Sequence, residues 1–474
     1  MKTFYPPIIS IRKKTSVFLI AVSVLLVGMH PPTMQSANPV STETRRVNIP
    51  NLQGLPFEPA IFWFGAVTPT QNNVDVRLWY YDEYMKIVVH IIDRLHWQDP
   101  SGNIADLTNW DAISLYFSLD GNVGSAPSKN AYRLDAQLGG LQASYRGNGS
   151  DWGNAAFSFD VTTTWRGDEG PNSGVDGKGW QVDFIIPFTS FGLSSPPPQG
   201  TIWGLGVIMH DRDDAQGATI NHKTWPEAMT GNTPGSWGQL SFGKAIYTPP
   251  TSTPEGEVII RHGKDGANVI DAAVGGHTIC GDNVDHWTEW GNTNYAGYSQ
   301  FNIQNQWDIS DWPCFSKFYI TFPLGAVPPG KVILSATLTL TLFGNAGGGS
   351  WGEPPDSYIE VFSVGEDWDE ATLTWNNAPL AVENISGTWV PPRDYSVPDQ
   401  PYDWDVSKAV NSSYQTNQPL RLAVYSIDGE MHSGKYFWTS DTDDWARPTL
   451  RIVYGETCTP RVDCSFVYLP LVKR

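Results

Sequence analysis

Cysteine, positive charge and histidine pairs are scarce in this sequence, and each scarcity argues against a class of protein. Only four residues are cysteine and no Cys-x-x-Cys pair occurs, so neither a thioredoxin-type motif nor a thiolate zinc knuckle is present. Lysine and arginine total 30 against 49 acidic residues, and the formal net charge of −19 argues against nucleic acid and anionic membrane surfaces as partners. No His-x-x-x-His pair occurs, which argues against a catalytic zinc site.

Long apolar runs are also missing, with one exception near the N-terminus. Residues 16–29 form an apolar run that follows a basic triplet at residues 12–14, and the small residues ending at Ala37 offer a cleavage point. The run is shorter than the ~20 residues that span a bilayer. We therefore expect residues 1–37 to be a secretory signal peptide that places the rest of the chain outside the cytoplasm. An uncleaved N-terminal anchor is the alternative.

What the sequence does contain is a series of short β-branched and aromatic runs separated by turn residues. Residues 179–188 and 336–343 alternate between apolar and polar side chains, which is typical of strands with one buried face. No long segment has apolar residues at the helical period of 3.6. We expect an all-β fold of two β-sandwich domains in tandem, joined by a Pro/Thr linker. The expected divisions are a linker at 38–55, a first sandwich at 56–247, the Pro/Thr linker at 248–256, a second sandwich at 257–455, and a C-terminal tail at 456–474.

The four cysteines suit an oxidising compartment and allow three pairings. Closeness in sequence favours a bond between Cys280 and Cys314 inside one domain. The same argument favours a small loop closed by Cys458 and Cys464 in the tail.

The first half resembles the family 9 carbohydrate-binding module and its DOMON-like relatives. The resemblance covers most of residues 56–247 and rests on ordered signatures, among them "NWDAISLYFSLDGN", "GWQVDFIIPFTSFGL" and "WPEAMTGNTPGSWGQLSF". It implies a β-sandwich that binds the ends of plant-type polysaccharides by stacking a sugar between aromatic rings.

That family uses two tryptophans for the stacking. Trp110 stands where the first is expected, with packing at the rim or in the core as the alternative role. The second would fall near Gly231, where no aromatic residue occurs. We expect Trp225 to supply the missing face, because Trp237 has the sequence setting of a core residue. Further exposed candidates in the intervening loops are Trp152 and Trp165.

The second half resembles the DNRLRE domain, which is grouped with family 96 carbohydrate-binding modules, over roughly residues 257–455. The signatures include "KFYITFPLGAVPPGKVILSATLTLTLF" and "IEVFSVGEDWDEATLTWNNAP". The run W-D-E-x-T-x-T-W-N-N-x-P inside the latter is the most specific motif in the chain. The resemblance implies a non-catalytic sandwich of an extracellular, polysaccharide-associated protein.

The same run raises the question of catalysis, because a glycosidase needs two carboxylates beside a sugar cleft. The acids of the run surround Trp368, with Trp375 downstream, and are Glu366, Asp367, Asp369 and Glu370. We expect a structural role instead: Trp368 and Trp375 pack, Thr372 and Thr374 occupy strand positions, and an acid accepts hydrogen bonds from backbone amides at a sandwich corner.

A second acidic group follows a predicted strand. Asp211, Asp213 and Asp214 lie in one turn, where alternating carboxylates can bind Ca²⁺. A solvated acidic turn is the alternative. Calcium is the only cofactor that we expect.

The sequence as a whole predicts a secreted protein with two carbohydrate-binding modules that binds extracellular polysaccharide without cleaving it. One rival is an accessory or catalytic component of polysaccharide degradation, with O-glycosyl hydrolase activity. The other is a DOMON-type redox module, for which Met209 and His210 are the candidate axial ligands of a haem.

Overall fold

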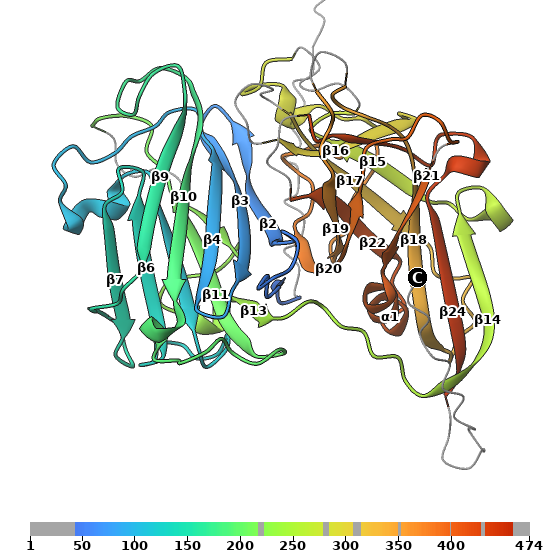
Figure 1. Cartoon of the computed structure of the whole chain (residues 1–474), viewed down its shortest axis with the longest axis horizontal. Coiled ribbons are helices and arrows are strands. Elements are labelled where there is room, and N and C mark those ends of the chain that lie inside the picture. The colour runs from blue at the N-terminus through green and yellow to red at the C-terminus, as the bar shows by residue number, and fades with distance from the viewer. Residues whose placement is uncertain are drawn as a thin grey trace, which may run out of the picture. The chain divides into compact units, whose positions relative to one another are not determined.

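A computed structural model describes residues 43–216, 222–277, 284–306, 314–348, 352–398, 400–427 and 432–457. These residues form an almost purely β structure, as predicted, with one α-helix, α1 (Ser407–Gln415), among them. None of the helices in these ranges is long and apolar enough to cross a bilayer. We call residues 43–247 the first module and residues 252–457 the second module (Figure 1).

The strands of the first module are β1 (Arg46–Ile49), β2 (Ala60–Thr68), β3 (Gln71–Tyr80), β4 (Tyr84–Ile92), β5 (Ala112–Ser118), β6 (Ala131–Gln137), β7 (Gln142–Gly147), β8 (Trp152–Asn154), β9 (Asp160–Gly167), β10 (Gly177–Pro187), β11 (Ile202–His210), β12 (Lys223–Trp225) and β13 (Gly238–Phe242). Those of the second module are β14 (Ser252–Arg261), β15 (Ile270–Val274), β16 (Gln300–Gln306), β17 (Cys314–Phe322), β18 (Val332–Asn345), β19 (Ser357–Val364), β20 (Ala381–Val390), β21 (Gln400–Asp405), β22 (Leu420–Ser426), β23 (Lys435–Trp438) and β24 (Thr449–Thr457). Short 3₁₀ helices are η1 (Ile104–Asn109), η2 (Phe188–Phe191), η3 (Pro234–Ser236), η4 (Lys264–Gly266), η5 (Trp290–Asn292) and η8 (Asp444–Ala446).

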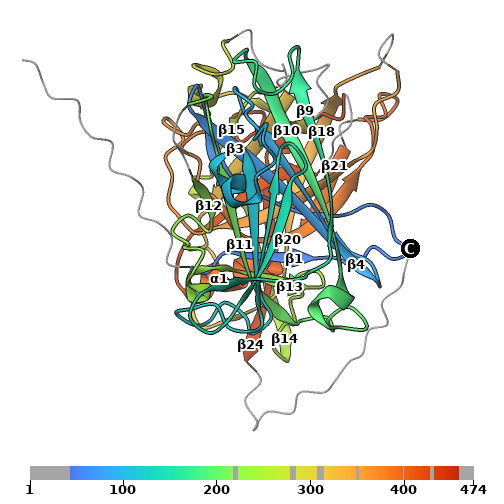
Figure 2. The same ribbon diagram turned by 90° about the vertical axis from the view of Figure 1, so that its left-hand side faces the viewer.

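The first module is a sandwich of two sheets. One sheet has the order β2-β3-β4-β10-β9, and the other runs from β8 through β7, β6, β5 and β11 to β13. Figure 2 labels β3, β4, β9 and β10 of the first sheet and β11 and β13 of the second. The alternation predicted for residues 179–188 is confirmed, because Trp180, Val182 and Phe184 on β10 are fully buried while the residues between them are partly exposed. The two inner faces therefore meet in one apolar core.

The second module is built in the same way around its own core. Strand β18 pairs with β21, β23 and β24, while β17, β22, β19 and β20 pair in series. Leu338, Leu340 and Leu342 of β18 are fully buried and alternate with threonines, as predicted for residues 336–343.

The connection between the modules differs from the prediction. Strand β1 lies inside the segment 38–55 expected to be a linker; it runs parallel to β13 and makes a bridge from Arg46 to Glu383 of β20. Strand β14 begins inside the expected linker 248–256 and pairs with β24. Its Pro254, which has no N–H to donate, stands at a break in the register. Local sequence cannot distinguish an extended linker from a strand whose partner lies far away in the chain.

The two modules also share an apolar interface, which the sequence analysis did not anticipate. On β2, Phe62 and Phe64 face the first core, while Ile61 and Trp63 point to the opposite side and are equally buried. They pack against residues of the second module, and the rings of Trp63 and Phe362 meet edge to face with centroids 4.9 Å apart. A strand buried on both faces requires a partner on each side. The modules are therefore docked along β2.

A buried lysine stands inside this interface. Lys317 on β17 is 2% exposed, and its Nζ lies 3.5 Å from the ring centroid of Trp375, 4.5 Å from that of Trp63 and 4.7 Å from that of Tyr425. Burial lowers the pKa of Lys317 to about 7, although the Asp75 carboxylate acts in the opposite direction. The three aromatic faces therefore offset only part of the cost of burying the cation.

This burial predicts a dependence of stability on pH. The folded chain releases the Lys317 proton near pH 7, whereas the unfolded chain keeps it up to about pH 10.4. Unfolding therefore takes up a proton between these values, so this lysine makes the free energy of unfolding rise with pH in that window. In denaturant titrations at pH 7 and pH 9, Lys317→Met should lose this rise, while Lys129→Met, at an exposed position, should keep it. Equal pH slopes in both variants would contradict the assignment.

Candidate functional site

The first module carries a polar pocket of about 400 Å³ on the sheet that contains β5, β6 and β7. Helix η1 forms one rim, and β8 with the loop before η3 forms the other. We call this the first-module pocket; the side chains that give it its chemistry are Arg133, Asp135, Tyr145, Trp152, Asn154 and Asn232.

An ion pair forms part of its wall. Arg133 and Asp135 are two residues apart on β6, so they project from the same face, opposite to the buried Leu134. Two parallel bonds join them, Nε to Oδ1 at 2.8 Å and Nη2 to Oδ2 at 2.7 Å. Burial raises the pKa of Asp135, and the arginine opposes that shift. The guanidinium also lies 5.0 Å from the ring centroid of Tyr145, so it is held from two sides.

Trp152 supplies an oriented aromatic ring at the opposite rim. Its indole Nε1 donates to Asn232 Oδ1 at 2.9 Å, and its ring packs on Tyr116 and lies parallel to Trp237, with centroids 6.4 Å apart. The ring is only partly buried. A partly exposed indole held beside fixed amide, carboxylate and guanidinium groups can stack on the apolar face of a sugar while polar groups bind its hydroxyls.

The residues predicted for sugar stacking have different places. Trp110 follows η1 and is partly buried, with the Arg212 guanidinium 3.9 Å from its ring centroid, and it does not line the first-module pocket. The prediction for Trp225 is wrong: the side chain is 1% exposed and stacks on Phe62 in the core, with ring centroids 4.0 Å apart. A buried ring has no face to offer a sugar.

The structure also accounts for the missing aromatic residue at Gly231. A Cβ at this position would lie 2.7 Å from the hydroxyl oxygen of Tyr116, so no larger side chain fits without rearrangement. Trp237 is 1% exposed and belongs to the small cluster beneath Trp152, as expected for a core residue. Trp165 on β9 is 41% exposed and lies outside the pocket.

Three carboxylates from separate strands meet at one edge of the same module. Asp93 follows β4, Asp111 precedes β5 and Asp211 follows β11, and one oxygen from each lies within 4.8 Å of the others. The pairing of β5 with β11, which sets Ala112 opposite His210, brings Asp111 and Asp211 together. We call these residues the acidic cluster.

The cluster has the properties of a cation site. Burial, and after it repulsion from other members of the cluster, raises the pKa of Asp93 and Asp111 well above the usual value. Burial, and after it repulsion from Asp213, raises the pKa of Asp211 to about 7. Asp211 Oδ2 is buried without a hydrogen-bond partner. Oxygen donors alone suit a hard cation such as Ca²⁺. The donor set differs from the prediction, because Asp214 is exposed and accepts from the Gln216 amide, and Asp213 stands outside the group.

The structure does not support a haem ligated by Met209 and His210. Successive residues on a strand point to opposite faces of the sheet. The Met209 side chain lies in the first core, while His210 contacts the Ser114 hydroxyl at 2.8 Å. The two side chains therefore cannot serve as ligands of the same iron.

The acidic run at residues 365–379 connects β19 to β20, where a corner was expected. Glu366 pairs with Arg45 at 2.6 Å, Asp367 pairs with Arg421 at 3.0 Å, and Asp369 Oδ1 accepts from the Ala371 amide at 2.9 Å. Trp368 and Trp375 are 8% and 5% exposed, as predicted for packing residues. These acids are engaged in structural contacts.

Two details of the run differ from the prediction. Thr372 lies in a turn and Thr374 in irregular structure rather than in a strand. Side chains close this loop, because Asn377 accepts from the Thr374 amide and donates to the Thr372 carbonyl. The run also reaches the first module, where Trp375 Nε1 donates to Asn73 Oδ1 at 3.1 Å and Asn376 bonds both the amide and the carbonyl of Val67.

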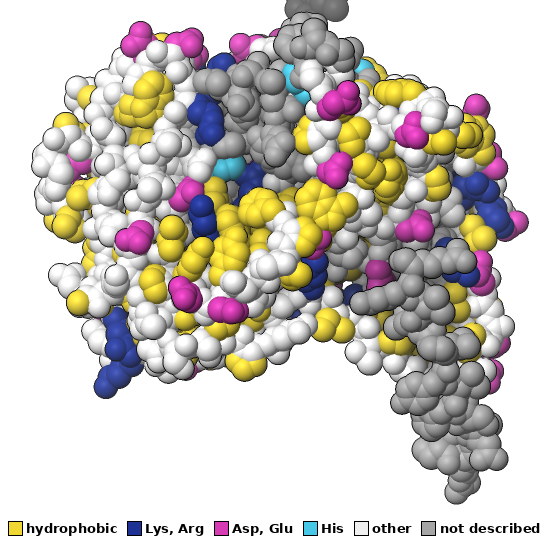
Figure 3. Space-filling view, viewed as in Figure 1, with side chains coloured by type: hydrophobic (Ala, Val, Ile, Leu, Met, Phe, Trp, Pro, Cys, Tyr) yellow, Lys and Arg dark blue, Asp and Glu magenta, His cyan; other side chains and the backbone are white. Residues whose placement is uncertain are grey.

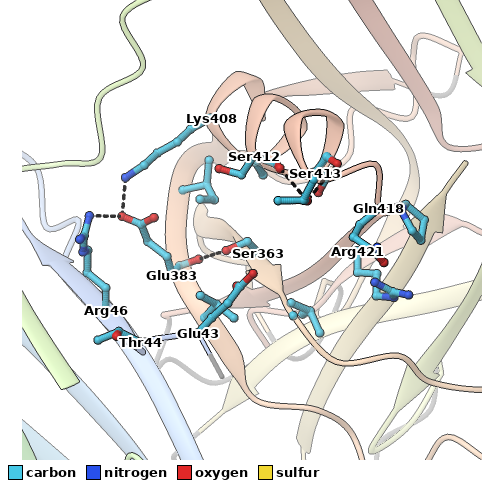
Figure 4. A pocket seen from close by; sticks show the side chains of 17 residues that line it. Glu43, Thr44, Arg46, Ser363, Glu383, Lys408, Ser412, Ser413, Gln418 and Arg421 are labelled. Carbon is cyan, nitrogen blue, oxygen red and sulfur yellow. Dashed lines mark hydrogen bonds and ion pairs between the residues drawn. The ribbon is translucent and has the colours of Figure 1, made fainter. Parts of the chain in front are cut away.

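Another pocket of about 390 Å³ lies between the segment preceding β1 and helix α1 (Figure 4). Three of its charged groups pair with each other, because Glu383 lies 3.7 Å from Arg46 and 2.5 Å from Lys408. No aromatic side chain is among its lining residues. This pocket therefore lacks the stacking surface that the first-module pocket has.

The signal peptide and most of the cysteines lie outside the described residues. Of the four cysteines, only Cys314 is described; it is buried at the start of β17 and is not a free thiol. The pairings Cys280–Cys314 and Cys458–Cys464 stay predictions.

Comparisons with known proteins agree with the assignment of the second half. Residues 285–454 match carbohydrate-binding module family 96, which confirms that resemblance. A search of curated proteins found no match. Similar solved structures include a family 9 module from Caldicellulosiruptor kristjanssonii in complex with cellotriose, with 14% identity over 42% of this chain and 94% of that one at a TM-score of 0.32. Another is a putative carbohydrate-binding protein from Bacteroides uniformis, with 13% identity over 38% of this chain and 86% of that one at a TM-score of 0.27.

Proposed function

We propose that this chain is a secreted, non-catalytic protein that binds polysaccharide through the first-module pocket. The observation that carries the proposal is the arrangement of Trp152, fixed by Asn232, opposite the bidentate pair of Arg133 and Asp135 in a concave surface. The match of the second module to a carbohydrate-binding family supports the same ligand class.

The charges of the pocket favour a neutral sugar. Arg133 is the cation of its wall, and Asp135 already neutralises it through two hydrogen bonds. The chain as a whole carries a net charge of −19, which repels polyuronates at long range. A neutral glycan needs no free cation in the pocket, and the net negative charge of the chain does not repel it.

The role that we propose for the second module is to hold the first in a fixed position while contributing to glycan binding. Its acidic run is engaged with Arg45, Arg421 and backbone amides, which supports a non-catalytic role. A reducing-end assay on xylan, pectin and alginate tests this point. Release of sugar ends by the purified chain would favour the hydrolase instead.

The proposal that the protein is exported rests on its sequence alone. The basic triplet, the apolar run and the small residues ending at Ala37 support cleavage at that point. N-terminal sequencing of the mature protein should find residue 38 first. An intact N-terminus in membrane fractions would favour the uncleaved anchor.

We further propose that the acidic cluster binds Ca²⁺ and thereby fixes the ends of β4, β5 and β11. Asp93, Asp111 and Asp211 would supply oxygen ligands, and the ion would remove the repulsion between them. None of the three carboxylates lines the first-module pocket, so the role that we propose for the ion is to stabilise the module.

Sugar binding should depend on Trp152. Trp152→Ala should weaken glycan binding by about 1–3 kcal/mol, the range for an aromatic hot spot, because the stacking face is lost. Isothermal titration with cellotetraose, xylotetraose and mannotetraose measures the effect. Trp165→Ala removes an exposed indole outside the pocket and serves as the matched control. Trp110→Ala tests the expectation from the sequence, and we expect a smaller loss because Arg212 covers one face. Complete loss of glycan binding in Trp110→Ala, with unchanged binding in Trp152→Ala, would place the sugar site at Trp110 instead.

A further inference from the structure

A small pocket opens where the two modules meet, and neither family resemblance assigns it a role. Asn48, Glu58 and Lys244 line it from the first module, and Tyr358, Glu360 and Asn384 line it from the second. Its volume is about 140 Å³. We call it the junction pocket. It shares no lining residue with the first-module pocket.

Aromatic rings stand at one side of the junction pocket. Tyr358 packs across β20 at Gly387, where a Cβ would lie 2.2 Å from the ring carbon Cζ, so only glycine leaves room for this ring. The Trp389 ring lies 5.3 Å from that of Tyr358, is 37% exposed, and donates from Nε1 to Glu58 Oε1 at 2.7 Å. The Glu58 carboxylate also pairs with Lys244. Trp389 is not one of the lining residues, but its indole is held against two residues that are, Tyr358 and Glu58.

Further apolar surface lies next to Glu58. Phe57, next to Glu58 in the chain, is 51% exposed and meets Trp79 edge to face, with ring centroids 5.0 Å apart. Figure 3 shows hydrophobic side chains gathered over β2 and β3 across the middle of its face.

Hydrogen-bonding groups form the floor. Glu360 is 5% exposed, and its carboxyl group accepts from the Ile61 amide at 3.3 Å and from Asn384 Nδ2 at 3.2 Å. Asn384 in turn accepts from the Asn48 amide at 2.8 Å and donates to the Asn48 carbonyl at 3.1 Å. Burial raises the pKa of Glu360 to about 8, so at neutral pH this carboxyl group holds a proton that it can donate.

We propose that the junction pocket binds one ring of a neutral sugar and is a second glycan site, complete only when the modules are docked. A water occupies about 30 Å³, so 140 Å³ is the space of roughly five waters, enough for one sugar ring. The rings offer a stacking face, and the carboxyl, amide and ammonium groups match hydroxyls. Lys244 is already paired with Glu58, so the site has no free cation for a uronate and a sugar without charge fits better. The choice of a sugar as ligand rests on the proposed function, whereas the position of the site does not, because its lining residues are separate from those of the first-module pocket.

Titration of the full chain with cellotetraose, xylotetraose and mannotetraose tests this site. The wild-type chain should bind two equivalents of the preferred tetraose. Trp389→Ala and Glu58→Gln should each abolish one equivalent or weaken it at least tenfold, with an unchanged melting temperature. Trp445→Ala, at an indole that is 60% exposed and does not line this pocket, is the matched control and should bind two equivalents.

The outcomes separate this site from the first-module pocket. Two equivalents of unchanged affinity in both Trp389→Ala and Glu58→Gln would overturn the junction site and leave the proposed function standing. A single equivalent that survives Trp152→Ala and is lost in Trp389→Ala would support the junction site and overturn the first-module pocket. No binding of any of the three tetraoses by the wild-type chain would overturn both.

Discussion

Replacing Trp375 by alanine should lower the free energy of unfolding of the whole chain by about 3–5 kcal/mol, the cost of truncating a buried aromatic residue. The ring is 5% exposed and packs on Trp290 with centroids 4.8 Å apart. It also forms one wall around Lys317 and bonds Asn73 across the interface between the modules. The loss would therefore leave a cavity, an uncovered cation and an unpaired amide at the same place.

Denaturant titration of the full chain measures this effect. Trp445→Ala removes an exposed indole and should stay within about 0.5 kcal/mol of the wild type. Because Trp375 belongs to the interface, the variant should also separate the unfolding of the modules into two transitions. A stability unchanged by Trp375→Ala would contradict both the packing of the run and the docking of the modules.

Removing calcium should destabilise the chain by a comparable amount. A ligand that binds only the folded state at 1,000 times its Kd contributes about 4.1 kcal/mol. Chelation would expose Asp93, Asp111 and Asp211 to mutual repulsion in a buried site. We therefore expect a clear fall in melting temperature in chelator, restored by added Ca²⁺. Asp211→Asn should lose this response, whereas Asp214→Asn, at an exposed position outside the cluster, should keep it.

The size of the chelator effect should depend on pH. In the absence of a cation, the carboxylates have pKa values above those of the unfolded chain, with that of Asp211 at about 7. Their contribution to stability is then fully present below the unfolded pKa and is lost as pH rises through the folded pKa. Chelator should consequently lower the melting temperature more at pH 8 than at pH 5. A melting temperature that chelator leaves unchanged at pH 8, with no metal in the purified protein, would contradict the calcium site.

Much of this architecture follows from patterns that a sequence displays locally. The alternation in β10 and β18 predicts which face is buried, and the composition of residues 365–379 predicts a corner with packed tryptophans. Each of these features depends on neighbours in the chain. The sequence alone therefore predicts them.

The features that escaped prediction all depend on distant partners. Strand β1 is recognisable only beside β13 and β20, and nothing near Asp93 or Asp111 in the sequence indicates that their strands end beside Asp211. Trp225 looked available because its local sequence does not reveal Phe62 against its ring. The one available signal for the first-module pocket was the spacing of Arg133 and Asp135 on a strand, with an exposed tryptophan nearby in the chain.

The most direct measurement of the central claim is a crystal structure of the whole chain soaked with cellotetraose, xylotetraose or mannotetraose. The account predicts a sugar ring over the Trp152 indole, with its hydroxyls within hydrogen-bond distance of the Arg133–Asp135 pair and Asn232. Sugar density over Trp110 alone, or no density in the first-module pocket at saturating concentrations of all three tetraoses, would contradict it.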